Sequence, residues 1–272
     1  MSKVVLVTGC SKGGIGYALC EAYAAQGCIV YATARRIESM AGFTHPNIHT
    51  LKLDVLDDAN VQEVVKTIVD KEGRVDILVN NAGAMAAGAM LDQSIDDARR
   101  AFETNTFSVL RLAKAVAPHM AQRKSGTIVN IGSVVGEIPT PWNGMYSATK
   151  AATHMISDTL WMECKPLGIN VTLVVPGAVK SNITANQQAI FKLPEDSLYP
   201  AYISQIMRRI SSSQGPGSMP SEEFARQVVK KTVRNKPPRY LTLGGRSRLF
   251  QFLQWLPRTW ALRFFWRVFS KP

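Results

Sequence analysis

The sequence lacks the features that mark secreted, membrane-spanning and metal-binding proteins. Its four cysteines show no Cys-x-x-Cys spacing, so we expect no disulfide framework and an intracellular, reducing compartment. Its four histidines are scattered, so we expect no metal site. No uncharged apolar run reaches the roughly 18 residues of a transmembrane helix. Residues 1–9 also lack the apolar segment and cleavage site of a secretory signal.

Acidic residues are absent after Glu223, and this stretch carries the whole positive excess. Residues 1–223 hold 20 Lys or Arg and 20 Asp or Glu, whereas residues 224–272 hold 12 Lys or Arg and account for the net charge of +12. Such an excess raises nucleic acid as a partner. However, residues 246–272 also contain eight Phe or Trp, and a membrane interface favours aromatic beside basic side chains. We therefore expect a membrane surface as partner and no nucleic acid.

The first two-thirds of the chain alternate short β-branched runs with longer segments of helical period, which is typical of a parallel α/β sheet. We predict a single-domain α/β protein with a Rossmann-type, doubly wound, seven-stranded sheet in three αβα layers. The expected strands are 3–9, 28–34, 48–54, 75–80, 127–131 and 169–175, and the expected helices are 14–26, 57–71, 96–122 and 144–164. The domain should span residues 1–243, with a variable substrate cover at about 181–217 and a basic aromatic tail at 244–272.

A glycine-rich turn from Thr8 to Gly16 joins the first expected strand to the first helix. In such a turn backbone N–H groups and the helix N-terminus face a pyrophosphate, although glycines there can also serve packing alone. The second strand ends at Arg35 and Arg36, with no acidic residue between Glu21 and Glu38. An acidic residue would accept the ribose hydroxyl of NAD, whereas arginine accommodates the 2′-phosphate of NADP. The sequence therefore predicts NADP as cofactor.

An acid–base pair is predicted at Tyr146 and Lys150, which stand four residues apart on one expected helix and project from the same face. A phenol has a pKa of about 10, and we expect the Lys150 ammonium to lower the pKa of Tyr146. Ser133 follows another expected strand and could hydrogen-bond a substrate carbonyl while Tyr146 protonates the developing alkoxide. Polar residues also end the third and fourth strands, at 54–55 and 80–83, where open α/β sheets bind ligands.

These motifs resemble the classical short-chain dehydrogenase/reductase family. The resemblance is carried, in the family's order, by the Thr8-Gly9 turn, Asp54, Asn80-Asn81-Ala82-Gly83, Asn105, Ser133, Tyr146-x-x-x-Lys150 and Pro176-Gly177. It implies hydride transfer between a nicotinamide and a carbonyl carbon, with Tyr146 as the acid/base and Lys150 on the nicotinamide ribose. Ser133 would orient the carbonyl, and Asn105 would position a water on the proton relay. The cofactor residues expected from the motifs and the resemblance are Gly9, Ser11, Lys12, Gly14, Ile15, Arg35, Arg36, Asp54, Val55, Asn81, Tyr146, Lys150, Val179 and Ser181.

The chain departs from the family pattern at one turn. Gly13-Gly14 stands where one glycine is usual, which leaves open which of Ser11, Lys12, Gly13 and Ile15 contacts phosphate. After Pro176-Gly177 the family often has a threonine, and here Ser181 keeps a hydroxyl.

Within the family, the glycine turn, residues 30–36 and the basic C-terminus are most similar to fungal acyl-dihydroxyacetone-phosphate reductases, which act on lipid intermediates. This implies NADPH-dependent reduction of an apolar or acyl-bearing ketone, by a protein that is cytoplasmic or peripheral on the endoplasmic reticulum or lipid droplets. A secondary-metabolite ketoreductase or a hydroxysteroid-type dehydrogenase acting on a polycyclic ketone stays open. Lys180, Arg208 and Arg209 are candidates to meet a substrate phosphate. Family members often pair through their long helices, so a homo-oligomer is also expected.

The tail has two apolar segments divided by Pro257. Leu249, Phe252, Leu253 and Leu256 form one predicted stripe, and beyond the proline arginines alternate with aromatic residues. A helix of this kind suits a membrane interface. Two other interpretations stay open, in which the tail packs on its own domain as part of the substrate cover or buries against a second subunit.

Overall fold

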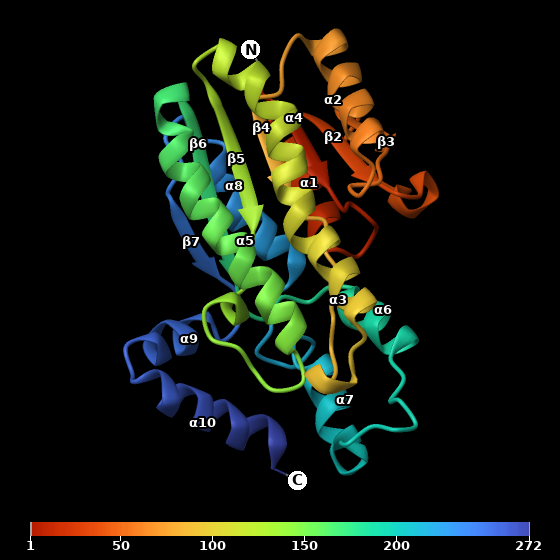
Figure 1. Ribbon diagram of the computed structural model, residues 1–272. Helices are drawn as coiled ribbons and strands as arrows, with labels where there is room; N and C mark the ends of the chain where they lie inside the picture. The colour runs from red at the N-terminus through yellow and green to blue at the C-terminus, as the bar shows by residue number, and fades with distance from the viewer. Residues whose placement is uncertain (1, 272) are drawn as a thin grey trace.

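Seven strands form one sheet at the centre of the protein, in the computed structural model that describes residues 2–271 (Figure 1). The order is β3-β2-β1-β4-β5-β6-β7, and every neighbouring pair is parallel. The strands are β1 (Val4–Thr8), β2 (Ile29–Ala34), β3 (Ile48–Lys52), β4 (Ile77–Asn80), β5 (Gly126–Ile131), β6 (Ile169–Pro176) and β7 (Tyr240–Leu243). The order reverses between β1 and β4, so the predicted doubly wound, Rossmann-type sheet is confirmed.

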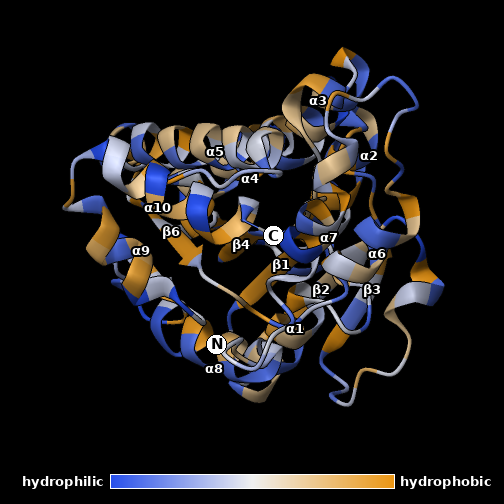
Figure 2. Ribbon diagram, turned by 90° about the horizontal axis from the view of Figure 1, so that it is seen from below, coloured by the Kyte–Doolittle hydropathy of each residue, from blue (hydrophilic) through white to orange (hydrophobic). Residues whose placement is uncertain are grey.

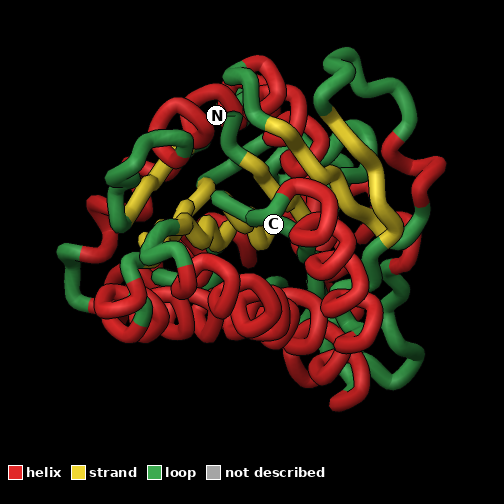
Figure 3. Tube along the Cα trace, turned by 90° about the horizontal axis from the view of Figure 1, so that it is seen from above, coloured by secondary structure: helices red, strands yellow, loops and turns green. Residues whose placement is uncertain are grey.

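Helices cover both faces of the sheet and complete the three expected layers. On one face lie α1 (Ile15–Ala25) and α8 (Ser221–Thr232). On the other lie α2 (Asp58–Glu72), α4 (Ser108–Gln122) and α5 (Gly144–Glu163). Figure 3 shows the strands between these two helical layers. Because both faces are covered, the central strands are buried along their whole length.

The sequence of α2 shows how such a helix is specified. Val61, Val65 and Ile68 recur at helical spacing and are buried against the sheet. The Asp57 side chain accepts hydrogen bonds from two backbone N–H groups of the first turn, and Gly73 ends the helix with a φ of 74°. The apolar spacing and the capping residues therefore indicate the same helix, and both ends of α2 lie one residue from the predicted range 57–71.

A π-helical turn interrupts the long helix expected at 96–122. The chain forms α3 (Ile95–Phe102), then a π turn (Glu103–Phe107), then α4. Asn105 lies in this turn and is fully buried. Such turns are frequent at functional sites because they re-aim side chains that a regular helix would place elsewhere.

The less regular elements gather at the carboxyl edge of the sheet, in the lower part of Figure 1. They are α6 (Ile183–Ile190), α7 (Ile203–Ser211), α9 (Ser247–Gln254) and α10 (Arg258–Ser270). Short 3-10 turns occur at Ile37–Met40, Met90–Asp92, Val134–Gly136, Lys165–Leu167 and Pro200–Tyr202. Within residues 2–271 no helix combines the length and apolar character needed to cross a bilayer.

The tail packs on its own domain through one side of each helix. Phe250, Leu253, Phe265 and Phe269 are buried in a cluster with residues of α7 and the segment before α5. Of the apolar stripe predicted for the first tail helix, Leu253 is buried, whereas Phe252 is 62% exposed. The contacting face is instead set by Phe250 and Leu253, which point back toward the domain.

Candidate active site

Two cavities open at the carboxyl edge of the sheet. The larger, here called the large cleft, has a volume of about 530 Å³ and passes the ends of β1 to β6. All the residues predicted to bind the cofactor line it except one: Gly9, Ser11, Lys12, Gly14, Ile15, Arg35, Arg36, Asp54, Val55, Asn81, Tyr146, Lys150 and Ser181. The exception is Val179, which lines the second cavity, so its contact with the cofactor stays a prediction. Its side chain packs into the core there, and its backbone bridges to Met219.

The glycine turn is held against β4 by hydrogen bonds. The Thr8 hydroxyl accepts from the N–H groups of Asn81 and Ala82, both at 3.0 Å. The Asn81 amide donates to the carbonyls of Thr8 and Gly9 at 2.8 and 3.0 Å. A Cβ on Gly9 would lie 2.8 Å from the Cα of Ala82, and the φ of Gly9 is +73°. Only glycine fits this close approach. Because the Asn81 amide donates to two carbonyls of the turn, the Asn81 side chain holds the turn against the end of β4.

The turn leads into a helix start that is free to face an anion. α1 begins after Gly14 with no side-chain cap and no acidic residue in its first turn, so its positive end points into the cleft. The extra glycine is accommodated by Asn182, whose amide donates to the Lys12 carbonyl at 2.7 Å and lies against Gly13. Ser11 lines the cleft and pairs with Ser39 at 3.1 Å.

Two arginines stand where β2 ends. Arg35 and Arg36 are both exposed at the cleft wall. Arg36 lies 3.9 Å from Glu38, whereas Arg35 makes no ion pair within residues 2–271. Asp54 lines the same wall, and one of its oxygens accepts from the Leu56 N–H at 3.0 Å. The free guanidinium makes this end of the cleft suited to a phosphate.

Tyr146, Ser133 and Lys150 meet where the two cavities adjoin. Tyr146 lines both cavities, Ser133 the smaller one and Lys150 the large cleft. The Lys150 ammonium is buried, donates to the Ile131 carbonyl at 2.8 Å and lies 5.7 Å from the centre of the Tyr146 ring. α5 carries both residues and is tied to the sheet by a buried chain of hydrogen bonds through Asn130 and Ser157. The predicted triad is therefore assembled.

The electrostatic expectation for this pair is corrected. Burial raises the pKa of Tyr146 to about 12, opposed by the positive charge of Arg209 and by a hydrogen bond with Ser133. Burial also lowers the pKa of Lys150 to about 8. The cation that favours the Tyr146 phenolate is therefore Arg209 from α7, and desolvation exceeds its effect.

Asn105 lines neither cavity, and its side chain is fully engaged. Its Oδ1 accepts from the Ala84 N–H at 2.8 Å, and its Nδ2 donates to the Ala84 carbonyl and the Thr149 hydroxyl at 2.9 and 3.0 Å. A Cβ placed on Gly83 would lie 3.2 Å from Asn105 Oδ1 and 3.8 Å from Lys150 Nζ. Asn105 thus joins the end of β4 to α5 beside Lys150, and a role in a proton relay stays a prediction.

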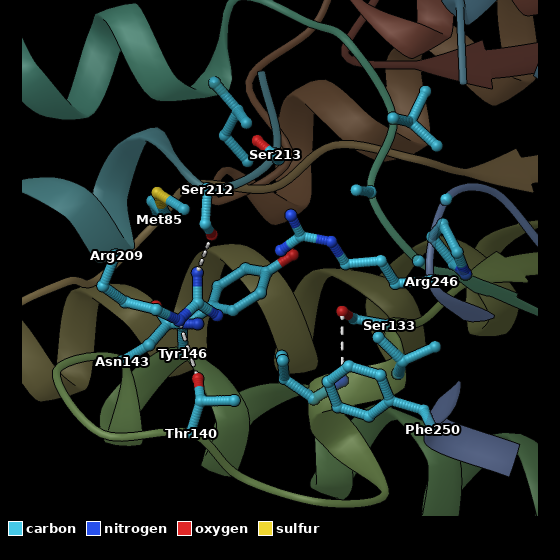
Figure 4. A pocket seen from close by; sticks show the side chains of 18 of the residues that line it. Met85, Ser133, Thr140, Asn143, Tyr146, Arg209, Ser212, Ser213, Arg246 and Phe250 are labelled. Carbon is cyan, nitrogen blue, oxygen red and sulfur yellow. Dashed lines mark hydrogen bonds between the residues drawn. The ribbon is translucent and has the colours of Figure 1, made fainter. Parts of the chain in front are cut away.

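The second cavity, here called the small pocket, has a volume of about 150 Å³ and lies beside Tyr146 (Figure 4). Its apolar wall includes Val134, Val135, Phe250 and Phe269, the last two from the tail. Two arginines line it, Arg209 and Arg246, and none of its described lining residues is acidic. Of the three basic residues considered for a substrate phosphate, only Arg209 reaches this pocket. Arg208 instead donates to carbonyls of Val268 and Lys271.

The family model for short chain dehydrogenases matches residues 3–190, which includes every strand of the large cleft. The chain belongs to the short-chain dehydrogenase family. It is therefore an oxidoreductase, and the resemblance seen in its motifs is confirmed. The match ends at the last residue of α6, so α7 and the tail, which wall the small pocket, lie outside it.

Individual members of the family are similar over most of the chain. The NADPH-dependent 1-acyldihydroxyacetone phosphate reductase of Schizosaccharomyces pombe is 38% identical over 256 residues, which is 93% of this chain and 82% of the relative. The crystal structure of a short-chain dehydrogenase from Streptomyces avermitilis aligns with a TM-score of 0.80 and 35% identity over 93% of this chain and 91% of that one. One from Sphingobium yanoikuyae, in complex with NADPH, aligns with a TM-score of 0.70 and 28% identity over 88% and 87% of the two chains.

Several residues of this dehydrogenase's site were missed by sequence reasoning. His154 was not among the predicted site residues, yet its Nε2 accepts the backbone N–H of Ser133 at 3.2 Å. Burial and nearby cations lower the pKa of His154 to about 4, so the ring is neutral and can accept. Its position four residues after Lys150 on one helix face was the available signal. Asn143 and Arg246 directly precede helices and gave no local signal, whereas Phe250 and Phe269 lie on α9 and α10 and reach the small pocket only because the tail docks on the domain.

The described part of the chain contains no cluster of His, Cys, Asp and Glu with the arrangement of a metal site. Lys150 and Arg209 are the buried cations at the reacting position. These two cations and the Ser133 hydroxyl could stabilise negative charge on a substrate oxygen near Tyr146.

Proposed function

We propose that this dehydrogenase is an NADPH-dependent ketone reductase that acts on an acyl-bearing ketone such as acyl-dihydroxyacetone phosphate. The observation that carries the proposal is the position of Tyr146, which lines both the large cleft and the small pocket. A group on Tyr146 can therefore contact a cofactor on one side and a ketone on the other. The Schizosaccharomyces pombe relative, named as a reductase of this kind, supports the substrate class.

The residues of the large cleft fit NADPH. The uncapped start of α1 and the glycine turn suit its pyrophosphate, and Arg35 suits its 2′-phosphate. Lys150 faces the same cleft and would hold the nicotinamide ribose. The NADPH complex of the Sphingobium yanoikuyae structure supports this choice of cofactor.

The raised pKa of Tyr146 keeps its hydroxyl in the protonated form that a reduction needs as proton donor. NADPH supplies the hydride for the carbonyl carbon when it is bound. With a pKa of about 12, the Tyr146 hydroxyl is protonated at neutral pH and donates its proton to the carbonyl oxygen as negative charge develops there. The Ser133 hydroxyl donates a hydrogen bond to the same oxygen. Arg209 then stabilises the phenolate until solvent returns a proton to it.

The test follows NADPH oxidation at about 340 nm with three ketones: an acyl-dihydroxyacetone phosphate, a steroid ketone and a polycyclic aromatic ketone. We expect a clear preference for the first. Tyr146→Phe should lower turnover by about 100- to 10,000-fold and leave the affinity for NADPH nearly unchanged. Surviving turnover in this variant would refute the mechanism. Preference for a polycyclic ketone would favour the biosynthetic alternative, which the apolar wall of Val134, Val135 and Phe250 could also accept.

We also propose that the tail binds a membrane surface, so that the enzyme is peripheral on the endoplasmic reticulum or lipid droplets. The side of the tail away from the domain exposes Trp255 by 89%, Trp260 by 61% and Phe252 by 62%. Figure 2 shows hydrophobic and hydrophilic residues interleaved on these helices. The hydrophilic ones include the exposed Arg263 and Arg267, which suits insertion among anionic headgroups. Flotation with vesicles of phosphatidylcholine and phosphatidylserine should recover the protein, and Trp255→Ser combined with Trp260→Ser should reduce this recovery. Equal recovery of both proteins would refute the membrane role.

Pairing of two chains through α4 and α5 is proposed as well. Met155 and Met162 of α5 are 66% and 59% exposed, and Leu110 of α4 is 39% exposed. These outward apolar side chains lie on the long helices and could be buried in a symmetric interface. Light scattering at micromolar concentration should give twice the mass of the chain or more, and a monomer would exclude the interface.

A further inference from the structure

A buried arginine faces the small pocket without an acidic partner. Arg209 is 6% exposed, its Nε donates to the Thr140 hydroxyl at 2.7 Å, and its Nη1 donates to the Ser212 hydroxyl at 2.9 Å. It takes part in no ion pair within residues 2–271. A guanidinium carries five N–H donors, so donors remain free on the side that lines the pocket. An unneutralised buried charge is costly, and a bound anion would remove that cost.

A second arginine approaches from the opposite wall. Arg246 begins α9 with a left-handed φ of 61°, and Figure 4 shows its side chain extending into the pocket toward Tyr146 and Ser213. Its side chain makes no hydrogen bond or ion pair with another described residue. A left-handed backbone is strained for a residue with a side chain, and here it directs the guanidinium inward. The two arginines therefore converge on one volume from α7 and from the tail.

A third polar group in the pocket also lacks a partner. The side chain of Asn143 is 1% exposed, and neither its Oδ1 nor its Nδ2 has a hydrogen-bond partner. Buried amides are normally satisfied, and Asn143 lines the same pocket as both arginines. A ligand with oxygen atoms would satisfy this amide and both cations together.

We propose that Arg209 and Arg246 form an anion subsite beside Tyr146, which selects a ketone carrying a phosphate monoester, with Asn143 as an additional hydrogen-bonding group. The proposal rests on the proposed ketone reductase function and specifies which part of the substrate the pocket recognises. Two guanidinium groups with no carboxylate nearby match a doubly charged group. The apolar wall of the small pocket, which includes Val134, Val135 and Phe250, would then contact the acyl chain of the ketone. A neutral polycyclic ketone would leave the buried Arg209 guanidinium and the buried Asn143 amide without this partner, while the exposed Arg246 would stay solvated by water.

A matched pair of substrates separates this subsite from general damage to the enzyme. The pair is 1-palmitoyl-dihydroxyacetone 3-phosphate and the same ketone without its phosphate. In Arg246→Gln we expect the ratio of kcat/KM for the phosphorylated over the neutral ketone to fall about 10- to 100-fold, the usual effect of one charge-assisted hydrogen bond. Arg248→Gln is the control, because Arg248 is also exposed on α9 but lines neither cavity, and it should keep the wild-type ratio. An unchanged ratio in Arg246→Gln would overturn the proposal.

A binding measurement tests the subsite without turnover. Protein saturated with NADP⁺ is titrated with inorganic phosphate by calorimetry, so that the phosphate sites of the large cleft are already filled. Phosphate should bind wild type, and its affinity should fall about tenfold or more in Arg246→Gln and in Arg209→Gln. Equal affinity in all three proteins would overturn the subsite even if ketones are reduced. Binding that depends on both arginines in a protein that reduces no ketone would keep the subsite and refute the proposed reaction. Tight NADP⁺ binding by each variant verifies its fold.

Discussion

The large cleft and the small pocket are built in different ways. The walls of the large cleft are strand ends and the start of α1, held by backbone hydrogen bonds such as those around Thr8 and Asn81. The small pocket shares the ends of β5 and β6 with the sheet, but its remaining walls come from α7, from residues 140–143 and from a tail more than 100 residues further along the chain. The first therefore depends on the sheet itself, and the second on whether separate segments dock correctly. We infer that the sheet determines the reaction and that the docked segments determine the ketone.

We expect the largest effect from Gly9→Ala, which adds one methyl group to the glycine turn of the large cleft. Gly9→Ala places a Cβ 2.8 Å from the Ala82 Cα in a residue whose φ is +73°. We expect it to lower the free energy of unfolding by about 3–5 kcal/mol and to weaken NADPH binding by about 100-fold, because the turn must move away from β4. Urea unfolding and fluorescence titration with NADPH measure the two effects.

Gly27→Ala is the matched control for this substitution. Gly27 has a φ of +76° but nothing within 4 Å of its Cβ position. It should therefore show only the backbone strain, about 1–2 kcal/mol, with NADPH affinity retained. If both variants behaved alike, the close approach of the turn to β4 would not matter for the cofactor.

This contrast also explains how far the sequence could be interpreted. The strands β1 to β6, the glycine turn and the Tyr146-Lys150 pair follow local rules of periodicity and spacing, so they were predicted within a few residues, whereas the short edge strand β7 was not located. The π turn at Asn105 was not predicted, because its cause is the set of contacts that Asn105 makes with Ala84 and Thr149. Whether the Arg246 side chain faces the small pocket depends on how the tail docks against the domain. No local pattern contains such long-range contacts.

A second prediction concerns which nicotinamide cofactor the large cleft selects. Arg35→Ala should weaken NADPH binding about 10- to 100-fold by removing a charge-assisted contact to the 2′-phosphate, and should change NADH binding less than threefold. Arg36→Ala should have a smaller effect, because Arg36 is already 3.9 Å from Glu38. Equal losses for both cofactors would show that Arg35 does not recognise the 2′-phosphate.

A third prediction tests whether the docked tail affects binding of the ketone without affecting binding of NADPH. Phe265 is 3% exposed and packs on Phe250, with ring centres 4.7 Å apart. Phe265→Ala should lower the stability of the docked tail by about 3–5 kcal/mol, so that the tail detaches from the domain. The KM for the ketone should then rise about tenfold, while the Kd for NADPH stays within twofold. Phe264→Ala, on the same helix but 38% exposed, is the control and should change neither. A parallel rise in both constants would mean that the tail also supports the large cleft.

The last prediction concerns the border of the two regions, where Ser133 is positioned. His154 accepts the Ser133 N–H, and its pKa is about 4, below its usual 6.5. Well above pH 6.5 the ring is neutral in both the folded and the unfolded chain. As the pH falls through 6.5 to 4, the unfolded chain gains a proton that the folded protein excludes, so the free energy of unfolding decreases by about 3 kcal/mol. His154→Gln keeps an acceptor for Ser133 but cannot titrate, so the difference in stability between wild type and variant should change across this window. A constant difference in urea unfolding between pH 7 and pH 4 would contradict the burial of a neutral ring behind Ser133. Ser133 would then owe its position to the end of β5 alone.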